Sequence, residues 1–293
     1  MTDGIFLINK EKFITSNKTL SLFKSKTKIK KAGILGILDP YATGVLPIVT
    51  GQALKYIQFI QQGKKGYSVK CRFGQYSISG DLETELTSYP DEQAIIKGLD
   101  KIKINHTLQK FMGNYMQTPP MYSSSKYKGK PLYKYARESI NIERTKKKRY
   151  IFDLQYISLN KDTFEFSVIC SSGTYIRTLV QDIAEDLNLH ACMIELNRNF
   201  VEPFEDYTAF LLNQLDVIEI EKSKINIDNM LNAFQKILFD NSDIDNIYNG
   251  KPVPLAINQP NNTLLRIYNN SNIFCGLGLV CEGQIIPKRL MKR

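Results

Sequence analysis

Residues 36–44 have the sequence GILDPYATG and place one carboxylate, Asp39, in a segment that is otherwise apolar and rich in glycine. The wider stretch 33–51 holds four Gly and two Pro, which predicts a structured loop rather than a long helix. An Asp-Pro pair commonly begins a turn or caps a helix, so one interpretation of Asp39 is structural. The other is a rigidly held carboxylate that acts as a nucleophile at a sugar carbon or accepts a proton.

The rest of the composition leaves few other sources of chemistry. The five cysteines are odd in number and form no CxxC pair, which argues against a disulfide framework or a zinc site. There are two histidines, too few for a multi-histidine metal site, and neither a GxGxxG nor a Walker A motif occurs. We therefore expect no metal and no nucleotide cofactor, and chemistry carried by carboxylate, Tyr, Lys or Arg.

The charge of the chain is segregated along the sequence. Lys and Arg number 39 against 29 Asp and Glu, a formal net charge of +10. Residues 18–31 carry six Lys and no acid, and residues 126–149 carry ten basic groups and two Glu, whereas residues 205–245 hold nine acids and three Lys. Tyr alternates with Lys and Arg in 126–137, a pattern that suits stacking on bases and contact with phosphates. The basic clusters have two other interpretations. One is a Lys-rich composition without a binding role, and a weaker one is attraction to a membrane surface.

Helix and strand patterns are mixed without regular alternation, which predicts the α+β class. We expect a strand over residues 67–73, a helix over 174–187, a strand over 191–196, helical packing over 205–245 and a small all-β module over 247–293. The sequence shows neither a long apolar run nor a signal-peptide pattern, so the expected location is the cytoplasm.

Two further residues have both a structural and a functional interpretation, and a third has a structural one. Arg177 forms either a salt bridge on a helix or the partner that keeps a buried carboxylate ionised. Tyr67 is either a half-buried strand aromatic or a ring that stacks on a flipped base and relays a proton. Leu196 is most simply a core residue.

Six blocks of this chain, in order, resemble bacterial tRNA pseudouridine-55 synthases of the TruB type. The blocks are residues 36–47 (GILDPYATGVLP), 65–67 (KGY), 119–123 (PPMYS), 126–137 (KYKGKPLYKYAR), 173–177 (GTYIR) and 196–198 (LNR). The resemblance is dense over residues 5–205 and loose over 247–293. It implies a pseudouridine synthase fold with a central mixed, largely antiparallel sheet flanked by helices and loops. It also implies a catalytic domain over 1–246 with an RNA-gripping insertion at about 121–149, and a small PUA-like RNA-binding β domain over 247–293.

The resemblance also implies the reaction and its residues. Asp39 falls on the family's catalytic aspartate, which attacks a flipped-out uridine so that its C1′–N1 bond breaks and a C1′–C5 bond forms, without cofactor or metal. Tyr67 falls on the tyrosine that stacks on the base, and Arg177 on the arginine that pairs with the carboxylate. Tyr175 and Leu196 match positions that line the uridine pocket, and Lys126, Lys130 and Arg137 lie in the RNA-gripping segment. The implied partner is the T-arm and elbow of tRNA, bound by a monomer.

The chain departs from the family pattern at identifiable places. Ile34 stands where the family usually has a histidine five residues before the aspartate, and Phe13 stands where an entry turn usually has glycine. The first departure concerns the hold on flipped-out bases and leaves the bond chemistry unaffected. It keeps a second hypothesis open, a tRNA-binding folding chaperone with weak or no catalysis.

Overall fold

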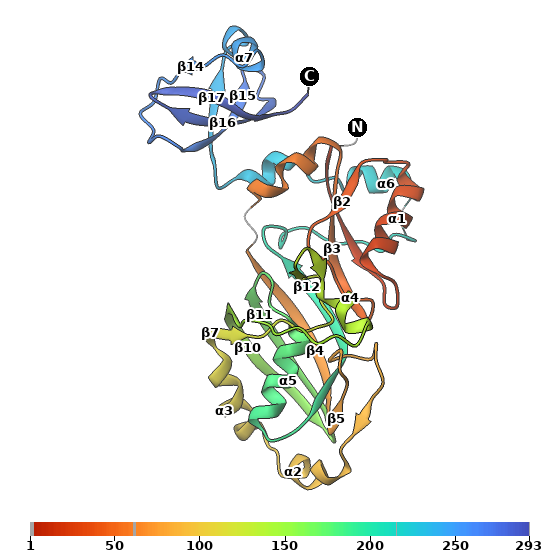
Figure 1. Ribbon diagram of the computed structural model, residues 1–293. Coiled ribbons are helices and arrows are strands. Elements are labelled where there is room, and N and C mark those ends of the chain that lie inside the picture. The colour runs from red at the N-terminus through yellow and green to blue at the C-terminus, as the bar shows by residue number, and fades with distance from the viewer. Residues whose placement is uncertain (1–2, 61–62, 215, 293) are drawn as a thin grey trace.

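A mixed eight-stranded sheet organises the larger part of the chain in the computed structural model, which describes residues 3–60, 63–214 and 216–292 (Figure 1). Its strands are β1 (Gly4–Lys10), β2 (Ala32–Ile34), β3 (Ala42–Thr50), β4 (Lys64–Phe73), β7 (Gly113–Gln117), β10 (Lys147–Asn160), β11 (Thr163–Ser171) and β12 (Ala191–Val201). Their order is β1-β3-β12-β4-β11-β10-β7, with β2 also paired to β3. Only β12 and β3 run parallel among these described pairs, so the predicted α+β class and largely antiparallel sheet are confirmed.

Helices cover the two parts of this sheet in different ways. The helices beside the sheet are α1 (Ser16–Thr27), α2 (Gln93–Lys97), α3 (Lys101–Phe111), α5 (Ile176–Asp186) and α6 (Val217–Lys222), with 3-10 turns η1 (Gly51–Phe59), η2 (Pro90–Glu92) and η3 (Ile227–Leu231). Helices α3 and α5 pack on one face of β4, β10, β11 and β12, and on the other face of β4 and β11 the side chains are mostly polar and half-buried. In contrast, β1 and β3 are covered on both faces, by η1 and η3 on one side and by α1 and α6 on the other.

The segment predicted as a loop over residues 33–51 is a loop only over residues 35–41. Strand β3 takes up residues 42–50, and eight of its nine residues are buried. A strand that is covered on both faces shows a continuous apolar run instead of alternation. In residues 42–50, one Gly and one Pro interrupt that run and obscure it. The loop that remains, residues 35–41, carries Asp39 between β2 and β3.

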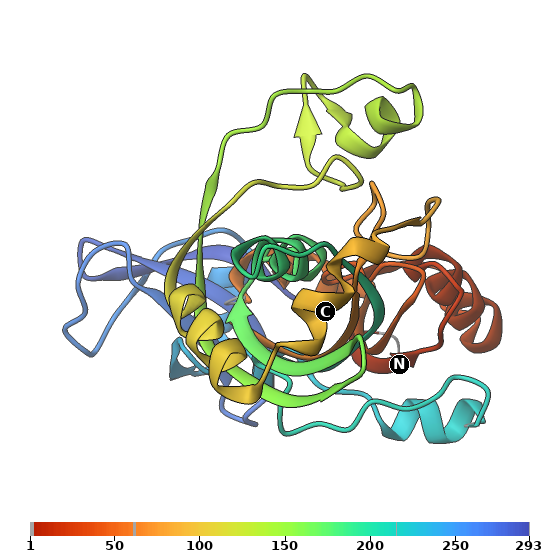
Figure 2. The ribbon, with the colours of Figure 1, turned by 90° about the horizontal axis from the view of Figure 1, so that it is seen from below.

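The insertion expected at about residues 121–149 extends from the sheet. It contains the hairpin β8 (Lys126–Tyr127) and β9 (Lys130–Pro131) and the short helix α4 (Leu132–Arg137). Seen from below, these elements stand away from the body of the molecule on the side of α5, connected by extended chain (Figure 2). They add almost nothing to the buried core, since Leu132 is the one fully buried residue of α4.

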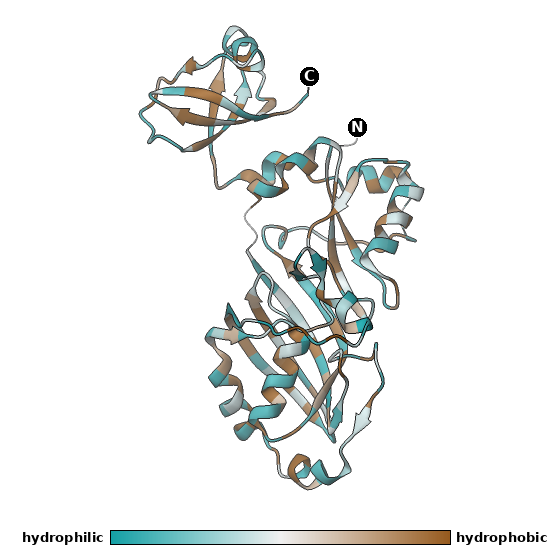
Figure 3. Cartoon of the chain, in the orientation of Figure 1, coloured by the Kyte–Doolittle hydropathy of each residue, from teal (hydrophilic) through white to brown (hydrophobic). Residues whose placement is uncertain are grey.

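A second sheet forms the C-terminal module. It contains β13 (Gln235–Phe239), β14 (Val253–Pro254), β15 (Leu264–Asn269), β16 (Phe274–Cys281) and β17 (Gln284–Leu290), in the order β13-β15-β16-β17-β14, and is accompanied by α7 (Asn241–Tyr248). The sheet and α7 bury an apolar cluster of their own, and much of the ribbon of this sheet has the colour of hydrophobic residues in Figure 3. Since β13 pairs with β15, the sheet begins at Gln235, within the segment predicted as helical packing, and that prediction is wrong for β13.

The C-terminal module contacts the rest of the protein through η1. Leu277 of β16 is buried in the cluster that contains Ala53 and Tyr56, and the Tyr56 hydroxyl donates to the carbonyl of Arg289 at 3.0 Å. The domain boundary at 246/247 remains a prediction. Among the described helices, none is long and apolar enough to cross a membrane.

Candidate active site

The loop that carries Asp39 is fixed on both sides of the carboxylate. On one side, the Ser16 hydroxyl donates to the carbonyl of Leu38 at 2.7 Å and accepts from its amide at 2.9 Å. On the other, the ammonium group of the fully buried Lys10 donates to the carbonyls of Pro40, Glu11 and Ile14. Burial lowers the pKa of Lys10 to about 8, and Asp39 opposes that shift. The first turn of α1 and the end of β1 therefore hold the position of Asp39.

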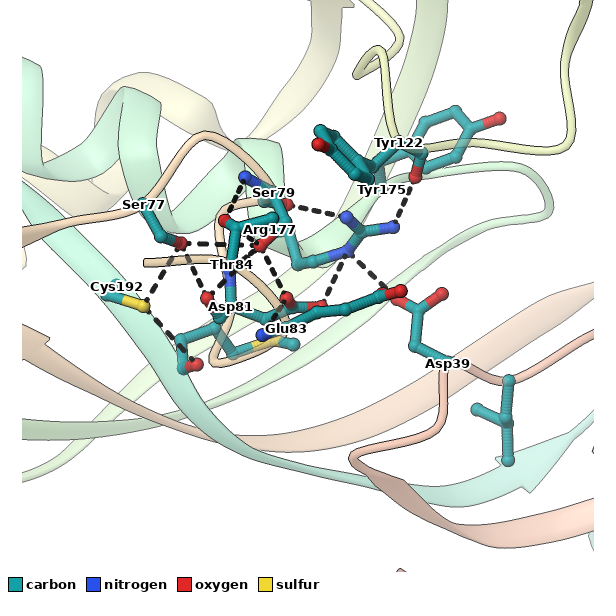
Figure 4. Close-up of polar contacts among 12 residues, drawn as sticks. Asp39, Ser77, Ser79, Asp81, Glu83, Thr84, Tyr122, Tyr175, Arg177 and Cys192 are labelled. Carbon is teal, nitrogen blue, oxygen red and sulfur yellow. Dashed lines mark hydrogen bonds and ion pairs between the residues drawn. The ribbon is translucent and has the colours of Figure 1, made fainter. Parts of the chain in front are cut away.

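Arg177, in the first turn of α5, reaches Asp39 from the opposite side. Its Nε is 2.9 Å from Oδ2 of Asp39 and 3.5 Å from Oδ2 of Asp81 (Figure 4). Its two terminal nitrogens donate to the carbonyls of Ser79 and Tyr122 at 2.5 and 2.8 Å. With 4% of its surface exposed, Arg177 is a fixed guanidinium between two carboxylates, as its predicted pairing with a carboxylate requires.

Asp81 belongs to the site but was not predicted from the sequence. It is fully buried, and its Oδ1 accepts hydrogen bonds from the Ser79 hydroxyl at 2.7 Å and the Glu83 amide at 2.9 Å. The Ser77 hydroxyl also donates to the carbonyl of Asp81 (Figure 4). The signal in the sequence is weak, because an acid in a Ser- and Gly-rich turn usually satisfies its own backbone.

The pKa of Asp39 results from opposing effects. Burial raises it, Arg177 lowers it, the negative charge of Asp81 raises it and Lys10 lowers it, and the outcome is a pKa above the ordinary value of 3.8. The side chain is still about one third exposed. Asp39 is therefore an accessible carboxylate that is more basic than a free aspartate.

Tyr67 lies in β4, opposite Arg198 of β12 across the antiparallel pair. Burial raises the pKa of Tyr67 to about 12, against the favourable effect of Arg198, so the hydroxyl is protonated at neutral pH. Arg198 is 1% exposed and also donates to the carbonyls of Val45 and Gly36 at 2.8 and 3.0 Å. It thus joins Tyr67 to the start of the loop that carries Asp39, through Gly36, and to β3, through Val45, a role that the sequence did not reveal.

Leu196 and Tyr175 border the same region. Leu196 packs in the core cluster with Leu38 and Tyr67. Tyr175 precedes α5, and its hydroxyl is 2.9 Å from Oγ of Ser125 in the insertion. The side-chain amide of Gln117, at the end of β7, donates to the carbonyl of Tyr175 and accepts from its backbone amide. The loop between β2 and β3, the strands β4 and β12 and the start of α5 therefore bring one group of residues together: Asp39, Tyr67, Leu196, Tyr175 and Arg177.

The three predicted RNA-binding cations lie apart from this cluster, in the insertion. Lys126 is exposed, Lys130 pairs with Glu138 at 2.6 Å, and Arg137 lies 3.7 Å from Glu83. Glu83 follows the turn of Asp81, so the last pair connects α4 with the site. Across residues 3–60, 63–214 and 216–292, no group of three or more His, Cys, Asp or Glu side chains is placed to hold a metal ion.

Comparisons with solved structures define the class. One structure described as an H/ACA RNP bound to a substrate RNA containing 2′-deoxyuridine aligns over 99% of this chain and 85% of that chain, with 18% identity and a TM-score of 0.70. A Cbf5-Nop10-Gar1 complex aligns over 99% of this chain and 84% of that chain, with 19% identity and a TM-score of 0.68. These likenesses establish the pseudouridine synthase fold, as the sequence predicted.

Sequence comparisons identify the family. Residues 24–176 match the model for the N-terminal domain of TruB family pseudouridylate synthases, and residues 237–291 match that for the TruB C-terminal domain. The tRNA pseudouridine synthase B of Coxiella burnetii (strain RSA 331 / Henzerling II) is 35% identical over 99% of this chain and 95% of its own length. That of Hydrogenovibrio crunogenus is 36% identical over 98% of this chain and 93% of its own length. The chain belongs to the TruB family of pseudouridine synthases.

Proposed function

We propose that this protein is a tRNA pseudouridine synthase, an isomerase that converts uridine 55 of the T-loop to pseudouridine. Family membership over nearly the whole chain supports the reaction and the substrate. The single observation that carries the proposal is the pair of Asp39 and Arg177, 2.9 Å apart, on a loop braced from both sides. A cytoplasmic location follows from the proposed substrate.

The reaction breaks the C1′–N1 bond of uridine and joins C1′ to C5. The C5 proton leaves the base and N1 gains a proton, so the product is an isomer of the substrate. We assign Asp39 as the nucleophile, which has to be ionised to attack. Arg177 favours the ionised form through its positive charge, while Asp81 and burial keep the carboxylate basic.

We assign Tyr67 to contact with the uracil base, by stacking and by proton transfer. A ring beside the catalytic carboxylate can stack on the flipped uracil, and its protonated hydroxyl can accept a proton only while passing its own onward. Tyr175 and Leu196 are assigned to the walls of the uridine pocket. A T-loop uridine is enclosed by folded RNA, so the enzyme has to extrude it to bring it to Asp39.

The insertion is assigned to RNA binding, together with the lysines of residues 18–31. It combines cations with rings: Lys130 lies 4.5 Å from the ring centroid of Tyr135, and Arg137 lies 5.4 Å from that of Tyr133. Such pairs offer both a flat surface for bases and charge for phosphates. The pairing of Lys130 and Arg137 with acids in the free protein means that RNA phosphates compete with those acids.

The Asp39→Asn variant tests the proposal. Asparagine keeps the shape of the side chain but is a poor nucleophile, so an unmodified tRNA transcript should be bound with nearly wild-type affinity and yield no pseudouridine. Pseudouridine mapping at position 55 after single-turnover incubation measures the outcome. Modification by Asp39→Asn at the wild-type rate would exclude the assigned nucleophile, and a wild-type protein that binds but never modifies tRNA would favour the chaperone hypothesis.

A further inference from the structure

An exposed aromatic side chain lies beside the catalytic loop in an unfavourable backbone conformation. Phe13, in the turn between β1 and α1, is 70% exposed and has a φ of 68°. The left-handed region suits glycine and asparagine, whereas a bulky side chain there is strained. Solitary exposed apolar residues are ordinary, but one that also imposes strain requires a compensating use.

The turn is rigidly joined to the loop of Asp39. The amide of Phe13 donates to the carbonyl of Pro40 at 2.9 Å, and the same carbonyl accepts from Lys10 at 3.1 Å. Lys10 also holds the carbonyls of Glu11 and Ile14, on either side of Phe13. The ring is therefore carried on a fixed support next to the nucleophile.

The surroundings of the ring have the chemistry of a base-binding site. Tyr41 meets the Phe13 ring edge to face, with 5.5 Å between centroids, and the ammonium group of Lys12 lies 5.3 Å from the Phe13 centroid. A hollow of about 330 Å³ opens beside Lys12 and Tyr41, and its lining includes the polar side chains of Thr43, Ser68 and Asn197. Its two acids, Glu165 and Glu195, are paired with Lys70.

We propose that Phe13, with Tyr41 and Lys12, is an accessory stacking site for an unpaired base of the substrate RNA, distinct from the target uridine. This inference rests on the proposed function. An aromatic ring supplies a sequence-tolerant surface for a base, and the adjacent lysine supplies charge for its phosphate. The site would help to hold the RNA after the target base has been extruded, close to Asp39.

Phe13→Asn separates this role from a structural one, because the two predict opposite changes. Asparagine tolerates the left-handed backbone, so the urea midpoint should stay the same or rise. Loss of the ring should weaken binding of an unmodified tRNA transcript about tenfold, measured in the Asp39→Asn background to prevent turnover. The slope of log Kd against log salt should not change, because the substitution removes no positive charge from the phosphates.

Two comparisons make the result specific. Phe13→Trp keeps an aromatic surface and should bind as the wild type does, whereas Ile102→Asn removes an 81% exposed apolar side chain on α3 and should leave binding unchanged. With 2-aminopurine at single unpaired T-arm positions, at least one position should show fluorescence quenching that Phe13→Asn abolishes. The inference would be overturned if Phe13→Asn bound tRNA with wild-type affinity, or if the quenching were the same in Phe13→Asn and in the wild type. Either result would count even if the protein forms pseudouridine 55.

Discussion

Burial is the largest cause of the raised pKa of Asp39, and the sharing of Arg177 between two carboxylates adds to it. If Asp39 were its sole acid, a buried arginine would strongly depress the pKa of that carboxylate. Asp81 pairs with the same guanidinium and adds a negative charge of its own, so it raises the pKa of Asp39 further than burial alone does. A more basic carboxylate is a better nucleophile, at the expense of ionisation at low pH.

Replacing Asp81 with Asn should reveal this effect in the pH dependence of catalysis. Only ionised Asp39 can attack, so kcat falls as pH decreases through its pKa. Removing the charge of Asp81 lowers that pKa, and the acid limb of the kcat profile should move to lower pH. At neutral pH we expect kcat to fall at least about tenfold, because Arg177 loses one of the groups that orient it. An acid limb at the wild-type position would contradict the assignment.

Tyr67→Phe tests whether the phenol takes part in proton transfer or only stacks. The ring is retained, so tRNA affinity should change little, while single-turnover kcat should fall about a hundredfold if the hydroxyl assists removal of the C5 proton. Val168→Ala serves as a control for small packing changes, because Val168 belongs to the same cluster, lies opposite Tyr67 in β11 and has no assigned role. A rate for Tyr67→Phe within twofold of the wild type would limit Tyr67 to a stacking role.

At the residue scale, the sequence predicts part of the site. The family resemblance pairs Arg177 with Asp39, and the structure contains this ion pair although the two residues lie far apart in the chain. The sequence does not identify Asp81 and Arg198, because a buried charge is revealed by what folds around it and not by its neighbours in sequence. Asp81 sits in a turn of serines, and Arg198 lies on the same face of β12 as the buried Leu196, where a charged side chain is seldom found.

Among the elements, α1 acts as a brace for the catalytic loop, and Ser16→Ala should show it. The substitution leaves the buried amide and carbonyl of Leu38 without partners, which should lower the free energy of unfolding by about 3 kcal/mol. Because Leu38 adjoins Asp39, kcat should fall while KM stays near its wild-type value.

Thr15→Ala is the matched control for that brace. Thr15 caps the same helix by accepting from the amide of Lys18, and it has no contact with Leu38 among the described hydrogen bonds. Its loss should cost about 1 kcal/mol of stability without an effect on kcat. Equal effects of Ser16→Ala and Thr15→Ala on kcat would show that helix stability, and not the brace, governs catalysis.

Element boundaries are predicted best where one physical signal dominates. The alternating pattern of β4 and the strong apolar face of α5 both predict the element that the structure contains. The prediction of a loop is wrong for β3 because burial on both faces removes alternation, and the prediction of helix is wrong for β13 because that short segment gains its identity from pairing with β15. Pairing between distant segments leaves no periodic trace in a single sequence.

For the whole molecule, the segregation of charge predicts how binding responds to salt. Lys126, Lys130 and Arg137 lie on the insertion that stands off the body (Figure 2). Replacing all three with Gln should weaken tRNA binding and reduce the slope of log Kd against log salt by about two to three, because that slope scales with the number of phosphates that the protein neutralises. As a control of equal charge, Gln at Lys222, Lys224 and Lys236 removes the three lysines of the acidic segment 205–245. Those replacements should leave the slope unchanged, so equal slopes for the two triple variants would show that net charge, rather than the insertion, attracts the RNA.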